Sequence, residues 1–183
     1  MFLTWESLNA VEHQAAVVIV VPMFCILPVS FLLSGSLASS LLIMLGSGLV
    51  QLHLFGVLWW ADVKLNYISL SYLTLAYAYS VQYFTILTKG YDIAPSDAKK
   101  PSPAKNRDEK VKIGLNRFGR AILHGSISCF LQVLMMAGSQ SYVMSTFCYI
   151  WIGAVMFTTL HSMVLLPVLL SFFGLLQQPS DSK

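Results

Sequence analysis

The sequence is poor in charged residues and in cysteine. Charged residues make up 10% of its 183 positions, while hydrophobic residues make up 56%. A soluble domain of this size needs more polar surface around its core, so the composition argues against one. Three cysteines, Cys25, Cys129 and Cys148, lie in apolar stretches without the spacing of metal ligands. They indicate small, buried hydrophobic side chains.

Acidic residues are missing from the long apolar stretches, since all eight lie outside them. The chain shows no nucleophile elbow, no phosphate-binding glycine loop and no paired carboxylates, and its histidines are scattered. We therefore expect no catalytic residue, no cofactor and no metal site, although composition alone leaves an integral-membrane enzyme open. The net charge of +3 belongs to one connection, which is no nucleic-acid signature.

Five uncharged stretches are long enough to cross a bilayer as helices, for which about 20 apolar residues suffice. They are Ala15–Leu33, Leu37–Trp60, Leu65–Leu87, a stretch from Ala121, and one from about Tyr142 to Leu170. The sequence thus predicts an all-α polytopic membrane protein with a five-helix transmembrane bundle. The expected plan is an interfacial segment 1–14, helices one to three in 15–88, a connection 89–120, helices four and five in 121–176, and a tail 177–183.

Basic residues predict the orientation of the bundle. Nine of the eleven Lys and Arg residues lie between Lys89 and Arg120, which places this connection in the cytosol. The N-terminus is then exofacial and the C-terminus cytosolic. An exofacial aromatic belt agrees with this, formed by Trp5, Trp59, Trp60, Trp151, Tyr67, Tyr142 and Tyr149. Plasma membrane and endomembrane are not distinguished.

Two flanking segments suggest helices on the membrane surface. The first fourteen residues suit a short exofacial interfacial helix, and Asp108–Gly119 suits an amphipathic helix on the cytosolic side. The basic connection has two open interpretations, a binding site for anionic headgroups and a plain orientation signal. Pro167 is expected to bend the last span.

Three motifs resemble the second half of eukaryotic resistance–nodulation–division permeases of the Niemann–Pick type C, Patched and Dispatched kind. They are "LFGVLWWADVKLNYISLSYLTLAYAYSVQYF" at 54–84, "GRAILHGSISCFLQVLMMAGSQSYVMSTF" at 119–147, and "LHSMVLLPVLLSFFG" at 160–174. The first contains Leu-Asn-x-x-Ser-Leu at the start of a helix, and the last contains His followed by Leu-Pro-Val-Leu-Leu-Ser. The resemblance covers residues 1 to about 176.

The resemblance implies a bundle like the second sterol-sensing-like repeat of a transporter of sterols or other lipids. Two such repeats rock around a shared site, so the chain would need a missing N-terminal half or another membrane subunit as partner. The alternatives are a non-transporting structural or regulatory subunit and a fragment of a longer transporter. Cargo, direction and driving ion stay open.

The resemblance also implies an ion-relay position on the third span. The family's Gly-x-x-x-acid motif is AYSVQ here, with Ala78 for the glycine and Gln82 for the acid. An amide does not titrate, so proton coupling through this position is in doubt. Gln82 is expected to face the bundle interior. His161 matches the family's last-helix histidine, and His124 lies at similar depth; either a titratable relay or ordinary packing accounts for them. His53 lies toward the exofacial side and is a poorer candidate.

Tyrosines on the third span form the last candidate site. Tyr72, Tyr79 and Tyr83 share one helical stripe at i, i+7 and i+11. A sterol lying against their ring faces and ordinary helix packing are both compatible with this stripe.

Overall fold

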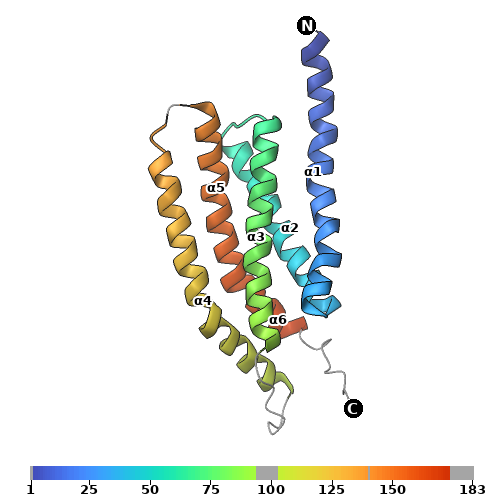
Figure 1. Cartoon of the computed structure of the whole chain (residues 1–183), viewed down its shortest axis with the longest axis vertical. Helices are drawn as coiled ribbons and strands as arrows, with labels where there is room; N and C mark the ends of the chain where they lie inside the picture. The colour runs from blue at the N-terminus through green and yellow to red at the C-terminus, as the bar shows by residue number, and fades with distance from the viewer. Residues whose placement is uncertain (1, 94–102, 140, 174–183) are drawn as a thin grey trace.

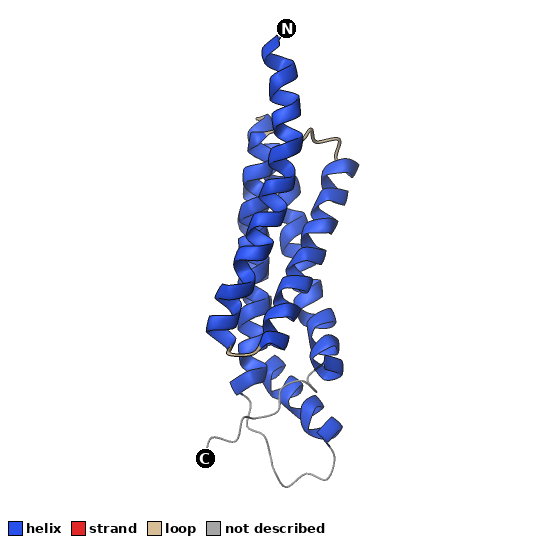
Figure 2. Cartoon of the chain, turned by 90° about the vertical axis from the view of Figure 1, so that its right-hand side faces the viewer, coloured by secondary structure: helices blue, strands red, loops and turns tan. Residues whose placement is uncertain are grey.

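The computed structural model describes residues 2–93, 103–139 and 141–173, and the described chain is almost wholly helical. The helices are α1 (Phe2–Ser34), α2 (Leu37–Trp60), α3 (Tyr67–Ile93), α4 (Pro103–Met136) and α5 (Tyr142–Leu160). A π-helical turn, η1 (His161–Leu165), joins α5 to α6 (Leu166–Phe173). No strand occurs among the described residues (Figure 2), which confirms the predicted all-α class.

Four segments are long and apolar enough to cross a membrane. They are Ala16–Leu33 of α1, all of α2, Glu109–Met136 of α4, and the continuous run Tyr142–Phe172 through α5, η1 and α6. These spans support a multi-pass membrane protein. The predicted third span, which corresponds to α3, is not among them. Twelve of the 27 residues of α3 carry a hydroxyl group, which lowers the hydropathy of this helix. That α3 crosses the bilayer stays a prediction.

The helices are longer and more continuous than the sequence patterns suggest. Residues 2–14 form the start of α1 rather than a separate helix, and Figure 1 shows this end of α1 rising beyond the bundle. Asp108–Gly119 likewise continues into the fourth span within the 34 residues of α4. There Val111 and Leu115 pack against the core, so their apolar face meets protein.

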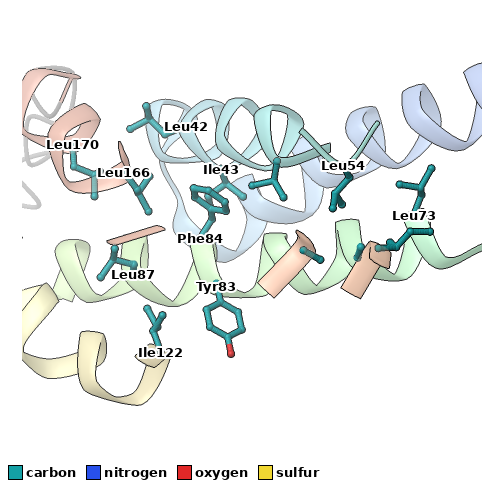
Figure 3. Packing of buried hydrophobic residues seen from close by; sticks show 14 of the residues in the cluster. Leu42, Ile43, Leu54, Leu73, Tyr83, Phe84, Leu87, Ile122, Leu166 and Leu170 are labelled. Carbon is teal, nitrogen blue, oxygen red and sulfur yellow. The ribbon is translucent and has the colours of Figure 1, made fainter. Parts of the chain in front are cut away.

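α3 is the central helix, since it contacts α1, α2, α4 and α5. Its buried face follows helical spacing, with Leu73, Ala76, Ser80, Phe84 and Leu87 on one side. Figure 3 shows Phe84 turned toward α2 and Tyr83 turned toward α4. The core of this bundle is therefore organised around α3.

The Leu-Asn-x-x-Ser-Leu motif starts α3 as a reciprocal cap. Asn66 Oδ1 accepts the backbone N–H of Ser69 at 2.9 Å, and Ser69 Oγ accepts the backbone N–H of Asn66 at 2.8 Å. Asn66 Nδ2 also donates to the Tyr142 hydroxyl at 3.0 Å, at the start of α5. The motif thus caps one helix and ties it to another.

Four aromatic residues of the predicted belt lie exposed at neighbouring helix ends, and their depth in a membrane stays a prediction. Trp59 and Trp60 are exposed at the end of α2, and Tyr67 and Tyr142 are exposed at the neighbouring helix starts. Trp151 was wrongly placed in the belt. It lies nine residues into α5, half-buried, with its ring centroid 5.6 Å from that of Tyr79. Cys25 also differs from expectation, because it is exposed on α1.

Pro167 does interrupt the last span. Its ring cannot follow a regular α-helix, because it lacks a donor and crowds the carbonyl four residues back. The helix widens into a π-helical turn just before Pro167, where the backbone N–H of Leu166 donates to His161 O, five residues back. The π turn therefore absorbs the proline and orients His161.

Glycines let α3 and α4 approach to backbone contact. A Cβ added to Gly114 of α4 would lie 3.1 Å from Gly90 C and from Tyr91 N on α3. Those atoms are backbone and cannot rotate away. Small residues at such crossings are the usual means of close helix packing in membranes.

Replacing Gly114 by Ala should therefore push α3 and α4 apart. We expect a loss of about 1–3 kcal/mol in the free energy of unfolding, the usual cost of overpacking. The measurement is unfolding of the detergent-solubilised chain followed by tryptophan fluorescence. Gly56→Ala is the matched control, because nothing lies within 4 Å of a Cβ built there. Equal stability of the two variants would contradict the backbone contact.

Candidate functional site

The sequence analysis predicted that Gln82 faces the bundle interior, but the structure places it on the outside. Its side chain is exposed, and so is Ala78 one turn earlier. The reason is register: the buried stripe of α3 passes through Ser80 and Phe84, and position 82 lies about 200° around the helix from position 80. The exposed stripe of α3 runs through Ser71, Leu75, Ala78 and Gln82.

The predicted cluster of Gln82, His124 and His161 does not form within the described chain. No hydrogen bond or ring contact among the described residues joins Gln82 to either histidine. His124 is exposed on α4. His161 is half-buried, and its ring lies against His53, with centroids 4.9 Å apart. His53 was the histidine that the sequence favoured least.

The three tyrosines pack between helices. Tyr72 meets Phe147 of α5 edge-on at 5.2 Å, and Tyr79 contacts both Tyr83 at 4.6 Å and Trp151. Tyr83 is buried against the core. Their rings thus belong to the interface of α3 with its neighbours. None of the three lines either groove described below. A direct role in ligand binding stays a prediction.

A groove of about 450 Å³ runs along α2 and is closed by α1 and α3. We call it the Gln51 groove. Its lining is Met23, Leu45, Gly48, Leu49, Gln51, Leu52, Phe55 and Tyr77. Its size falls within the range of small-molecule sites. Nearly all of this lining is apolar.

Gln51 is the polar exception in this groove. It is only 4% exposed, and its Nε2 donates to Leu73 O on α3 at 3.4 Å. Its Oε1 is buried and has no hydrogen-bond partner within the described part of the chain. A buried acceptor left unpaired costs about 1–3 kcal/mol. Gln51 thus adds one unpaired acceptor, buried behind the surface of an otherwise apolar groove.

Neighbouring polar groups are already paired. Ser47 Oγ donates to Ile43 O at 2.8 Å and lies 3.4 Å from the Tyr77 hydroxyl. The free acceptor of Gln51 is thus distinguished from the hydroxyl groups beside it. This fixes the expected point of polar contact to one atom.

A second groove, of about 430 Å³, lies between α2 and α5. We call it the His53 groove, and its lining is Leu52, His53, Gly56, Val57, Trp60 and Phe157. Leu52 lines both grooves, so they adjoin on the outward side of α2. α2 thus contributes one polar side chain to each groove, the Gln51 amide to the first and the His53 imidazole to the second.

Sequence reasoning missed Gln51 and undervalued His53. Both are polar residues inside the second apolar stretch, the same signal that singled out Gln82. An uncharged span surrounded by lipid has no polar face to indicate which amide points inward. A polar residue in an apolar stretch thus marked Gln51, His53 and Gln82 alike, and it did not indicate which of them points toward a groove.

The fold and grooves define a class: a polytopic helical membrane bundle with apolar grooves along α2. No protein-family model matches the chain. Individual proteins do. A Niemann-Pick type C1-related protein of Toxoplasma gondii is 29% identical over 170 residues, which are 93% of this chain and 14% of that protein.

Two further relatives agree. Protein patched homolog 1 of Danio rerio is 26% identical over 174 residues, covering 94% of this chain and 14% of its own length. NPC intracellular cholesterol transporter 1 of Sus scrofa is 23% identical over 128 residues, which are 69% of this chain and 9% of that protein. This chain is related to the Niemann–Pick type C and Patched proteins, as its motifs predict. It spans about a seventh of the length of the first two relatives.

Proposed function

We propose that the chain is the lipid-binding bundle of the second half of a Niemann–Pick type C or Patched-type transporter. Its ligand is a sterol or a similar apolar molecule with a hydroxyl group. The unpaired Oε1 of Gln51 in an otherwise apolar groove is the observation that carries this proposal. The name of the pig relative, an intracellular cholesterol transporter, supports the same ligand class.

Hydrogen bonding supplies the selectivity. When an apolar ligand moves from water into a groove, burial stabilises it by about 25 cal/mol for each Å² of apolar surface removed from water. In a bilayer this gain largely disappears, because lipid tails are as apolar as the groove. A hydroxyl donor to Gln51 Oε1 then distinguishes the ligand from ordinary lipid tails.

The outward face of α3 supports a partner. An amide exposed to hydrocarbon is costly, and Gln82 lies on an exposed stripe that also holds the small residues Ser71 and Ala78 and the apolar Leu75. We propose that helices of a first half, as in the much longer relatives, cover this stripe. Transport by alternating access requires both halves.

The second candidate function is a non-transporting, sterol-binding regulatory subunit. One observation favours it: the position equivalent to the relay acid carries the amide of Gln82, which binds no proton at physiological pH. Lipid binding in the Gln51 groove is common to both functions. Association with a first half separates them.

Selectivity for a hydroxyl tests the Gln51 groove. The purified chain should bind a fluorescent sterol more tightly than its 3-O-methyl ether by about tenfold, or ~1.4 kcal/mol. Gln51→Leu should abolish this preference, because the acceptor is gone. Gln82→Leu, the matched control on an exposed amide, should retain it. If the wild-type chain bound both sterols equally, the proposed hydrogen bond would be wrong.

Assembly tests the α3 stripe. Isolated from its native membrane in mild detergent, the chain should co-elute with a polypeptide that carries a first set of spans. Ala78→Trp should lower this association by about tenfold through overpacking at the interface. Leu32→Trp, at an 83% exposed site on α1, should not. Elution of the wild-type chain alone, with bound sterol, would point to the non-transporting subunit.

Orientation is tested by cysteine accessibility, with the three native cysteines replaced. We propose that the exposed Lys112 of α4 is cytosolic and the exposed Ser139 exofacial. When only the plasma membrane is permeabilised, Lys112→Cys should become labelled by an impermeant maleimide. Ser139→Cys should react in intact cells if the protein lies in the plasma membrane. It should react only after every membrane is permeabilised if the protein lies in an organelle. The reverse pattern would overturn the positive-inside assignment.

A further inference from the structure

Two histidines that lie 108 positions apart in the sequence meet where α2 passes the π turn. The ring centroids of His53 and His161 are 4.9 Å apart, with an angle of 62° between the ring planes. Phe157 packs against His53 at 4.8 Å and against His161 at 6.3 Å. The three rings therefore form one compact cluster beside the His53 groove.

The backbone determines the tautomer of each ring. His53 Nδ1 lies 2.7 Å from Leu49 O, and His161 Nδ1 lies 2.8 Å from Phe157 O. A carbonyl oxygen only accepts, so each Nδ1 must carry the hydrogen and donate it. In the neutral ring the proton is then absent from Nε2. Both histidines thus present a lone pair on Nε2.

These two lone pairs cannot satisfy each other. Each Nε2 is an acceptor, and no described side chain donates a hydrogen bond to either one. Each ring leans toward the carbonyl one turn back in its own helix, and α2 and α5 run in opposite directions (Figure 1). The two rings therefore approach from helices of opposite direction and meet edge to face, with their centroids 4.9 Å apart. Two neutral imidazoles this close, each with an unpaired Nε2, are suited to share a cation.

We propose that His53 and His161 form a chelating site for a late first-row divalent cation, with Zn²⁺ as the representative ion. Neutral imidazole is a preferred ligand of these metals. Zn–N bonds of about 2.0–2.1 Å at a tetrahedral angle place two imidazole centroids about 5 Å apart. The centroids here are 4.9 Å apart.

The surroundings match what a metal-binding histidine requires. Such a ring usually donates its other N–H to a carbonyl or carboxylate, which orients it and raises its basicity. Both rings already do so through Leu49 O and Phe157 O. The His53 groove is open beside them, which leaves room for water to complete the coordination. His53 is seven residues, or about 10 Å, from the exposed Trp60 at the end of α2, so water is near.

The consequence is a cross-link between α2 and the π turn. η1 is the widened turn that precedes Pro167, and π turns are frequent at functional sites. A cation held by His53 and His161 would hold this turn against α2. It would thereby restrict the last span at the point where its helix is least regular.

Zn²⁺ titration tests this site on the full chain, purified in detergent through a tag without histidine. We expect one Zn²⁺ per chain by calorimetry. His53→Gln and His161→Gln should each weaken binding by about tenfold or more, because a chelate loses one of its two ligands. His124→Gln, an exposed lone histidine on α4, should bind as the wild type does.

Co²⁺ supplies a readout that does not depend on any variant. One Co²⁺ held in a tetrahedral nitrogen and oxygen site should give visible absorption bands in the wild-type chain, and Zn²⁺ should displace them. Absence of these bands, or Zn²⁺ binding by the two variants as tight as by the wild type, would overturn the proposal. Loss of binding in His124→Gln would show an adventitious surface site and would overturn it as well.

Discussion

The need to enclose α3 governs the rest of this bundle. Twelve of its 27 side chains carry a hydroxyl, which makes it the helix of the bundle least suited to contact with lipid. Several hydroxyls bond to carbonyls of the same helix, as Thr74 does with Leu70 O at 3.0 Å and Thr85 with Val81 O at 2.7 Å. The remaining cost is reduced by burial, and α1, α2, α4 and α5 all contact α3. The glycine crossing with α4 is one result of this enclosure.

The helices themselves were predictable because backbone polar groups in a bilayer must form hydrogen bonds within their own segment, as they do in a helix. Apolar length alone gave the positions of four spans, and the Leu-Asn-x-x-Ser-Leu motif marked the start of α3 through the cap between Asn66 and Ser69. Pro167 marked the irregular turn of the last span. These are local signals, carried by residues a few positions apart.

The orientation of each helix about its axis was not predictable in the same way. In a soluble protein the polar face of a helix identifies its outside. In a membrane the lipid and the core are equally apolar, so Gln51 and Gln82 look alike in the sequence although one is buried and the other exposed. Long-range pairs such as His53 with His161, or Asn66 with Tyr142, were likewise invisible, because only the packing brings them together.

The arrangement separates two kinds of surface on neighbouring helices. The outward side of α2 carries both grooves, joined at Leu52, and the His53 ring, while the unpaired Gln51 Oε1 lies on the buried side of one groove. The outward side of α3 carries the exposed stripe of Ser71, Leu75, Ala78 and Gln82. A half-transporter needs both kinds of surface, one open to lipid for its ligand and one closed against its partner. Because these surfaces are on different helices, a partner on α3 would not have to displace a ligand held against α2.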